Sequence, residues 1–179
     1  MKKSKLSFFL ISCFLLFCSC EEKSLHLTEV PTRDDKGNIQ ILIATPSENK
    51  NFVEFDFVNQ RFNSTKKSNS LQNIAHTGYL AGKNSLQTAI VIGQKAKTGS
   101  LIKTLPIGIV KFGYENRHLD WHIYADVNSE ICDLEDFMLN HFHLKEMLQS
   151  KLKLLEADEK SKVIWYDEAF LESKINQIL

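Results

Sequence analysis

The spacing of apolar and polar positions changes several times along the chain, and each change predicts a different kind of segment. Three lysines stand among the first five residues, and a mostly apolar run follows at residues 6–17. Residues 20–38 are polar and contain Pro31 and Gly37, so they predict a tether that runs into a turn. Ordered structure is expected to begin near Ile39.

From this point the pattern is typical of β-strands. Residues 39–45 are apolar and residues 52–57 alternate at period two, which predicts two antiparallel strands in succession. Residues 60–76 are polar and without a period, and we expect a long surface loop there. The two glycines of residues 78–82 predict a turn.

Three further strands precede a helical region. The strands are expected at residues 89–92, 101–112 and 119–127. Apolar positions then recur at helical spacing over residues 134–148, with Asp133 as the predicted N-cap, and a second helix is expected from Asp167. Strands followed by helices indicate an α+β domain.

The beginning of the chain predicts export. The apolar run at 6–17 is shorter than the ~20 residues that a bilayer-spanning helix needs, so residues 1–19 predict a signal peptide. A small residue before Cys20 resembles a bacterial lipoprotein processing site. This resemblance implies a lipid-anchored protein of the cell envelope that contacts a membrane through its N-terminal lipid. An ordinary exported protein cut nearby and an uncleaved anchor are the alternatives.

Composition narrows the class of protein. The chain has 179 residues with 22 basic and 22 acidic side chains, which fits one domain at residues 39–179 and argues against nucleic acid as a partner. Beyond Cys20 only Cys132 remains, so a disulfide framework is excluded. We expect Cys132 to be a small buried apolar residue.

Several stretches together resemble the soluble family I inorganic pyrophosphatases, including their bacterial lipoprotein members. In the order and spacing of that family, they are residues 43–46, 53–56, 78–82, 90–93, 98–99, 105–110 and 120–125. The resemblance runs from about residue 40 to residue 172. It implies an OB-like five-stranded antiparallel β-barrel with two C-terminal helices.

The chemistry of that family is only partly retained. Pyrophosphate hydrolysis uses divalent cations held by carboxylates. The resemblance implies three such carboxylates in an Asp-x-Asp-Pro-x-Asp motif. Here residues 83–88 read Lys-Asn-Ser-Leu-Gln-Thr, so all three acids are absent and Lys83 replaces the first. Glu54 and Asp120 match acids of the family and Glu115 stands where another is expected. Glu115 and Asp120 are therefore candidate metal ligands, and Glu54 is a relic catalytic candidate.

Three functions remain open. The favoured one is a tethered pyrophosphatase-like module that binds a partner or serves a structural role, without catalysis and without a cofactor. The second is an active diphosphatase that uses magnesium at an atypical site. The third is a metal-free module for phosphate or another anion, in which Lys83, His122 and His143 bind the ligand.

Each of these residues also has a purely structural interpretation. Glu54 and Glu115 are equally consistent with surface charges, and Trp121 and Trp165 with core aromatics. The lysine pair at residues 66–67 is expected at a solvated loop tip.

Overall fold

The computed structural model describes residues 27–82, 87–114, 117–155 and 162–178. Its elements follow one another as η1 (Leu27–Glu29), β1 (Ile39–Thr45), β2 (Asn51–Asp56), β3 (Arg61–Ser68), β4 (His76–Leu80), β5 (Thr88–Ile92), β6 (Leu101–Tyr114), β7 (Arg117–Asp126), α2 (Leu134–Leu139), α3 (Phe142–Leu155), β8 (Lys162–Tyr166) and α4 (Glu168–Ile178).

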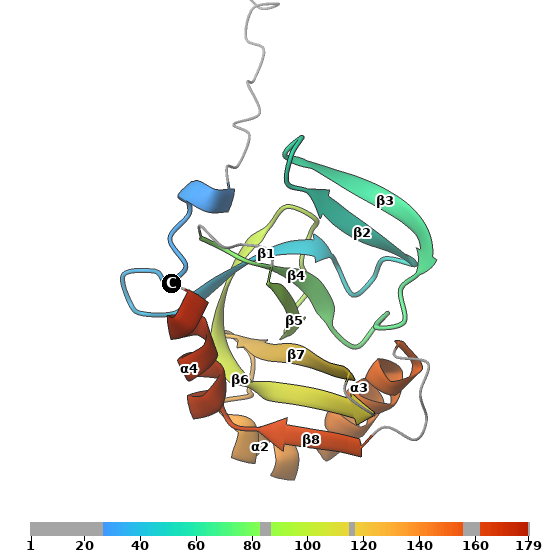
Figure 1. Ribbon diagram of the computed structural model, residues 1–179, viewed down its shortest axis with the longest axis vertical. Coiled ribbons are helices and arrows are strands. Elements are labelled where there is room, and N and C mark those ends of the chain that lie inside the picture. The colour runs from blue at the N-terminus through green and yellow to red at the C-terminus, as the bar shows by residue number, and fades with distance from the viewer. Residues whose placement is uncertain (1–26, 83–86, 115–116, 156–161, 179) are drawn as a thin grey trace, which may run out of the picture.

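Five of the strands form a closed barrel (Figure 1). Their order is β1-β4-β5-β7-β6, and β6 pairs with β1 to close the circle. The β5–β7 pair is parallel and the other four barrel pairs are antiparallel. The expected α+β fold with an OB-like five-stranded barrel is confirmed, with this one parallel pair as a refinement.

β6 is the longest strand and carries an additional strand outside the barrel. It pairs with β1, β7 and β8, and its register with β7 shifts between Pro106 and Gly108. A Cβ atom at Gly108 would lie 2.3 Å from the carbonyl oxygen of Tyr166. Only glycine therefore allows the end of β8 to approach β6 this closely.

The barrel interior is filled from all five strands and closed by α4. On each strand the contributing positions alternate with positions that point outward. The buried side chains are Ile39, Ile41, Ile43, Leu80, Ala89, Val91, Ile109, Tyr124, Leu171 and Ile175. Because Leu171 and Ile175 belong to α4, this helix is part of the interior core rather than a surface addition.

A second core lies on the outer face of β5, β6 and β7. Ile123 and Ala125 of β7 contact this core together with Leu148 and Leu152 of α3. The helical region at 134–148 is divided into α2 and α3 rather than continuous, and α2 ends at the C-cap residue Asn140. The predicted N-cap is confirmed, since the Asp133 carboxylate accepts a hydrogen bond from the Asp136 backbone N–H at 2.8 Å.

Two local expectations from the sequence are wrong. Residues 60–76 are not one loop, because Arg61–Ser68 forms β3 and pairs with β2 in a separate hairpin. Residues 78–82 are not simply a turn, because His76–Leu80 forms the barrel strand β4. In both cases cross-strand hydrogen bonds decide the structure of a segment whose own pattern is polar or glycine-rich.

The segment before β1 packs against the barrel. Leu27 is fully buried, and the Thr32 hydroxyl donates a hydrogen bond to the Ala81 carbonyl at 2.7 Å. Arg33 forms an ion pair with Glu172 of α4. Part of the stretch expected to be a tether is thus in contact with the domain, whereas the proposed signal peptide and Cys20 lie outside the described residues.

The described helices include none that is long and apolar enough to span a bilayer. The free thiol of Cys132 is exposed, so the expectation of a buried cysteine is wrong. Cys132 directly precedes the N-cap of α2, and its backbone N–H donates to the Asp136 carboxylate at 3.1 Å. Its position is therefore set by the hydrogen bond of its backbone at the start of α2 and not by burial of its side chain.

Candidate functional site

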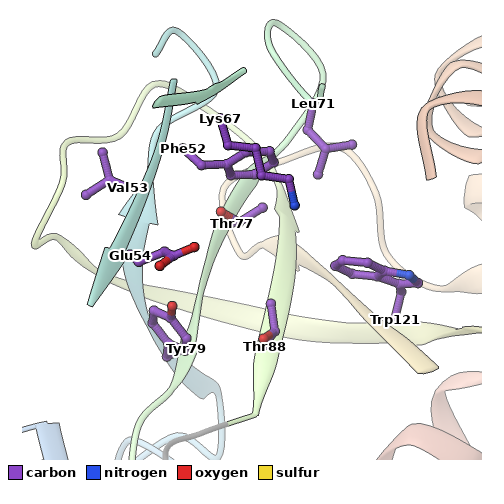
Figure 2. A pocket seen from close by; sticks show the side chains of 9 residues that line it. All are labelled: Phe52, Val53, Glu54, Lys67, Leu71, Thr77, Tyr79, Thr88 and Trp121. Atoms are coloured by element: carbon purple, nitrogen blue, oxygen red, sulfur yellow. The ribbon is translucent and has the colours of Figure 1, made fainter. Parts of the chain in front are cut away.

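A cavity of about 270 Å³ lies between the β2–β3 hairpin and the outer face of the barrel (Figure 2). The hairpin wall is formed by Phe52, Val53, Glu54 and Lys67. Phe52 and Glu54 occupy alternate positions of β2 and therefore point to the same side of the strand. In Figure 2 both side chains turn toward the cavity, and Lys67 extends across the ring of Phe52.

Two sets of contacts hold the hairpin in place. The Thr45 side chain at the end of β1 exchanges hydrogen bonds with the backbone N–H and C=O of Val53, both at 2.9 Å. Phe55 is buried, and its ring centroid lies 4.9 Å from that of Phe62. Phe57 meets Tyr79 of β4 edge to face at 5.1 Å. The hairpin wall is therefore fixed relative to the barrel by packing.

The barrel wall is formed by outward-facing residues of three neighbouring strands. Its members are Thr77 and Tyr79 of β4, Thr88 of β5 and Trp121 of β7, with Leu71 beside them. Tyr79 pairs directly with Thr88 across β4 and β5. The β5–β7 register pairs Ala89 with His122, which places Thr88 and Trp121 on one face.

The cavity is bordered by one acid and one base. Glu54 and Lys67 are both exposed, and neither forms an ion pair with another described residue. The Lys67 Nζ lies 5.5 Å from the centroid of the Phe52 ring. Burial raises the pKa of Tyr79, a backbone hydrogen bond with Phe55 opposes this effect, and the charge of Glu54 raises the pKa further. The Tyr79 hydroxyl is therefore neutral at pH 7 beside the carboxyl group of Glu54.

Asp120 does not belong to this cavity. It lies one position before Trp121 on β7, so its side chain points to the opposite face of the strand. The register places it opposite Lys111 of β6, and the Lys111 Nζ lies 3.3 Å from the Asp120 Oδ2. Lys111 also lies over the stacked rings of Tyr166 and Phe170, 5.1 and 5.2 Å from their centroids.

His122 shares the inward face with Asp120 and is held as a neutral ring. Its Nε2 lies 3.1 Å from the Gln87 side-chain nitrogen. Burial lowers its pKa to about 4; Asp120 opposes this shift, while Lys174 and Lys111 add to it. At neutral pH His122 therefore carries no charge with which to attract an anion.

Of the other candidate residues for anion binding, the described one, His143, is not brought together with His122. His143 is exposed in the first turn of α3, which covers the outer face of the β7 sheet, whereas His122 points inward. The sheet therefore separates these two histidines. Lys83 and Glu115 lie outside the described residues, as Cys20 does.

A pair of divalent cations does not fit the donor atoms that surround these positions. Among the residues that the structure describes, no group of three or more His, Cys, Asp or Glu side chains is placed to hold a metal ion. Among the described residues that line the cavity, Glu54 is the one carboxylate, and Asp120 is paired with an ammonium group. Hard cations need several oxygen ligands, and the described residues do not bring several together at these positions.

Sequence reasoning missed Lys67, Phe52 and Trp121 as residues of the site. Lys67 was expected at a loop tip, and it stands on β3 beside the cavity. A signal for the hairpin was present at Asp56, whose carboxylate accepts hydrogen bonds from the backbone N–H groups of Val58 and Asn59, both at 3.0 Å. An Asp with an Asn three residues later is a turn former, and this turn connects β2 to β3.

Comparison with known proteins identifies the fold. No family model and no curated protein matches the chain. Among solved structures, the type I inorganic pyrophosphatase from P. falciparum superposes with a TM-score of 0.68 at 16% identity, covering 84% of this chain and 60% of that one. An inorganic pyrophosphatase from Neisseria gonorrhoeae gives 0.64 at 16% identity, over 84% of this chain and 95% of that one. One from Ehrlichia chaffeensis gives 0.60 at 17% identity, over 84% and 99%. The chain therefore has the pyrophosphatase-like OB barrel that the sequence resemblance implied.

Proposed function

We propose that the chain is a lipid-anchored binding module built on a pyrophosphatase-like barrel, without diphosphatase activity. One observation supports this most directly: the two family-matching acids that are described do not face a common site. Glu54 borders the outer cavity, while Asp120 points to the inner face and pairs with Lys111. Two-metal hydrolysis requires carboxylates that converge on adjacent cations.

The charges near these positions also oppose cation binding. The Lys111 ammonium group occupies the place beside Asp120 that a cation would take. In the sequence, the segment 83–88 carries Lys83 and no acid. A positive side chain in place of a carboxylate repels a divalent cation.

The cavity supports the binding part of the proposal. Small-molecule sites are concave, mostly apolar, and carry a few polar groups that orient the ligand. This cavity combines aromatic residues from two walls with one acid, one base and a neutral tyrosine hydroxyl. Such a site recognises a ligand without a cofactor, and magnesium would enter only if the diphosphatase alternative were correct.

The anchoring part of the proposal rests on the beginning of the sequence. Cleavage before Cys20 would leave an N-terminal cysteine to carry lipid, which holds the domain at a membrane of the cell envelope. Growth with a labelled fatty acid tests this. We expect label in the protein and its recovery with membranes, and the loss of both in Cys20→Ser. Label retained in Cys20→Ser would contradict the proposal.

Phosphate release from pyrophosphate tests the absence of catalysis. The purified full chain in detergent is assayed with magnesium, manganese and zinc, with the Neisseria gonorrhoeae pyrophosphatase as the positive control. We expect release no faster than in buffer with any of the three metals. Metal-dependent turnover that is lost in Glu54→Gln or Asp120→Asn would establish the diphosphatase alternative instead.

A further inference from the structure

We infer that the cavity binds a small zwitterion with an apolar body, of the chemical class of free α-amino acids with apolar or aromatic side chains. The inference rests on the proposed function, because it assigns a ligand class to the same cavity. It is carried by two opposite charges that form no ion pair with a described residue, at the border of an aromatic site.

The charges require a ligand that has both signs. Glu54 and Lys67 line the same cavity and form no ion pair with each other or with another described residue. A ligand that covers the cavity removes water from both groups. A ligand with one charge would leave the other group desolvated and unpaired, which costs free energy. An ammonium group at Glu54 and a carboxylate at Lys67 satisfy both.

The same two residues disfavour the alternatives. An inorganic phosphate or pyrophosphate would meet the negative charge of Glu54. An organic cation seated on the Phe52 ring would compete with the Lys67 Nζ, which already lies 5.5 Å from that ring. Tyr79 adds a neutral hydroxyl on the Glu54 side of the cavity (Figure 2).

The rest of the lining fits an apolar body. Leu71 and Trp121 lie on the barrel side and Phe52 on the hairpin side. The volume of about 270 Å³ lies just below the usual range of ligand pockets, which begins at about 300 Å³, and this limits the ligand to a small molecule. An aromatic ring or branched aliphatic group would be buried between these side chains.

Calorimetric titration with L-phenylalanine and two analogues of matched size tests the requirement for both charges. Phenethylamine lacks the carboxylate and 3-phenylpropionate lacks the ammonium group. We expect L-phenylalanine to bind about tenfold more tightly than either analogue, since each loses one charge-assisted contact. Equal affinity for all three, or no heat of binding at millimolar concentration, would overturn the inference.

Two cavity variants test the orientation. We expect Glu54→Gln to weaken L-phenylalanine about tenfold and to leave 3-phenylpropionate unchanged, and Lys67→Met to weaken L-phenylalanine and leave phenethylamine unchanged. Glu48→Gln and Lys66→Met change exposed neighbours outside the cavity and are the matched controls. Unchanged affinity for L-phenylalanine in either cavity variant would contradict the assignment.

The failure of this inference can be told apart from the failure of the proposed function. Phosphate release is measured on the same preparation. Turnover of pyrophosphate would overturn the proposed function, whereas absence of both turnover and amino-acid binding would overturn only the ligand class.

Discussion

Two charged regions lie on opposite sides of the barrel strand β7, one on its inner face and the other on the β2–β3 hairpin that faces its outer side. On the inner face of β7, Asp120 pairs with Lys111, and His122 is buried and neutral. On the outer side, Glu54 and Lys67 border a cavity, and neither forms an ion pair with a described residue. A charged group in an ion pair stabilises the fold, while a charged group outside an ion pair remains available to a ligand.

The two regions also differ in what they contribute to the fold. The barrel depends on interior apolar side chains and on α4, and none of these core residues lines the cavity. Acidic residues can therefore be replaced or paired with lysines at little cost to the core. Four tests on variants of the two faces follow, from the largest expected effect to the smallest.

We expect the largest difference between the barrel interior and the cavity wall in the stability lost when a packed side chain is shortened. Leu171 of α4 is fully buried in the barrel interior, and Leu171→Ala should lower the free energy of unfolding by about 2–5 kcal/mol because it leaves a void. Val53, half-buried at the cavity, is the control, and Val53→Ala should cost less than about 1.5 kcal/mol. Urea unfolding measures both. Similar costs for the two would remove the distinction between the interior and the cavity wall.

The inner face should also respond to acid through His122. Burial lowers its pKa from 6.5 to about 4. Between these values the unfolded chain binds a proton that the folded chain does not, so stability is full above pH 6.5 and is lost as the pH falls toward 4. The loss is at most about 3 kcal/mol.

Urea unfolding at a series of pH values checks this prediction in the parent protein and in His122→Gln. Carboxylates add acid sensitivity to both proteins, so the difference between the two curves isolates the histidine. We expect that difference to change between pH 6.5 and 4. Parallel curves across this window would show that His122 is not buried as a neutral ring.

Replacement of one lysine in each region compares Lys111, which forms an ion pair, with Lys67, which forms none with a described residue. Lys111→Met should lower the free energy of unfolding by about 1 kcal/mol, because it removes the partner of Asp120 and the cation over Tyr166 and Phe170. Lys67→Met should change it by less than about 0.5 kcal/mol. Thermal unfolding of the two variants measures the difference, and a larger effect at Lys67 would reverse the comparison.

The smallest expected effect is on a tyrosine at the cavity. The charge of Glu54 adds to the raised pKa of Tyr79, so Glu54→Gln should lower that pKa, although burial keeps it above its ordinary value. NMR titration of protein with labelled tyrosine, assigned with Tyr79→Phe, measures the shift. An unchanged Tyr79 titration would place Glu54 farther from the hydroxyl than the structure does.

Local patterns in the sequence determined much of the barrel. β1 is apolar at nearly every position and fully buried, and the apolar run of β5 likewise marks a strand enclosed on both faces. The helix start at Asp133 was also readable, because an N-cap acts through hydrogen bonds within four residues. These features depend on residues close together in the chain, so the sequence of each segment predicts them.

Only the tertiary structure decided which residues share a site. β3 is polar because most of its side chains are exposed, and its pairing with β2 becomes visible only in the folded hairpin. The register of β7 places Asp120 against Lys111 and Trp121 toward the cavity, and a one-residue shift would exchange the two faces. Register between strands far apart in the chain depends on packing across the whole barrel, which no single stretch of sequence contains.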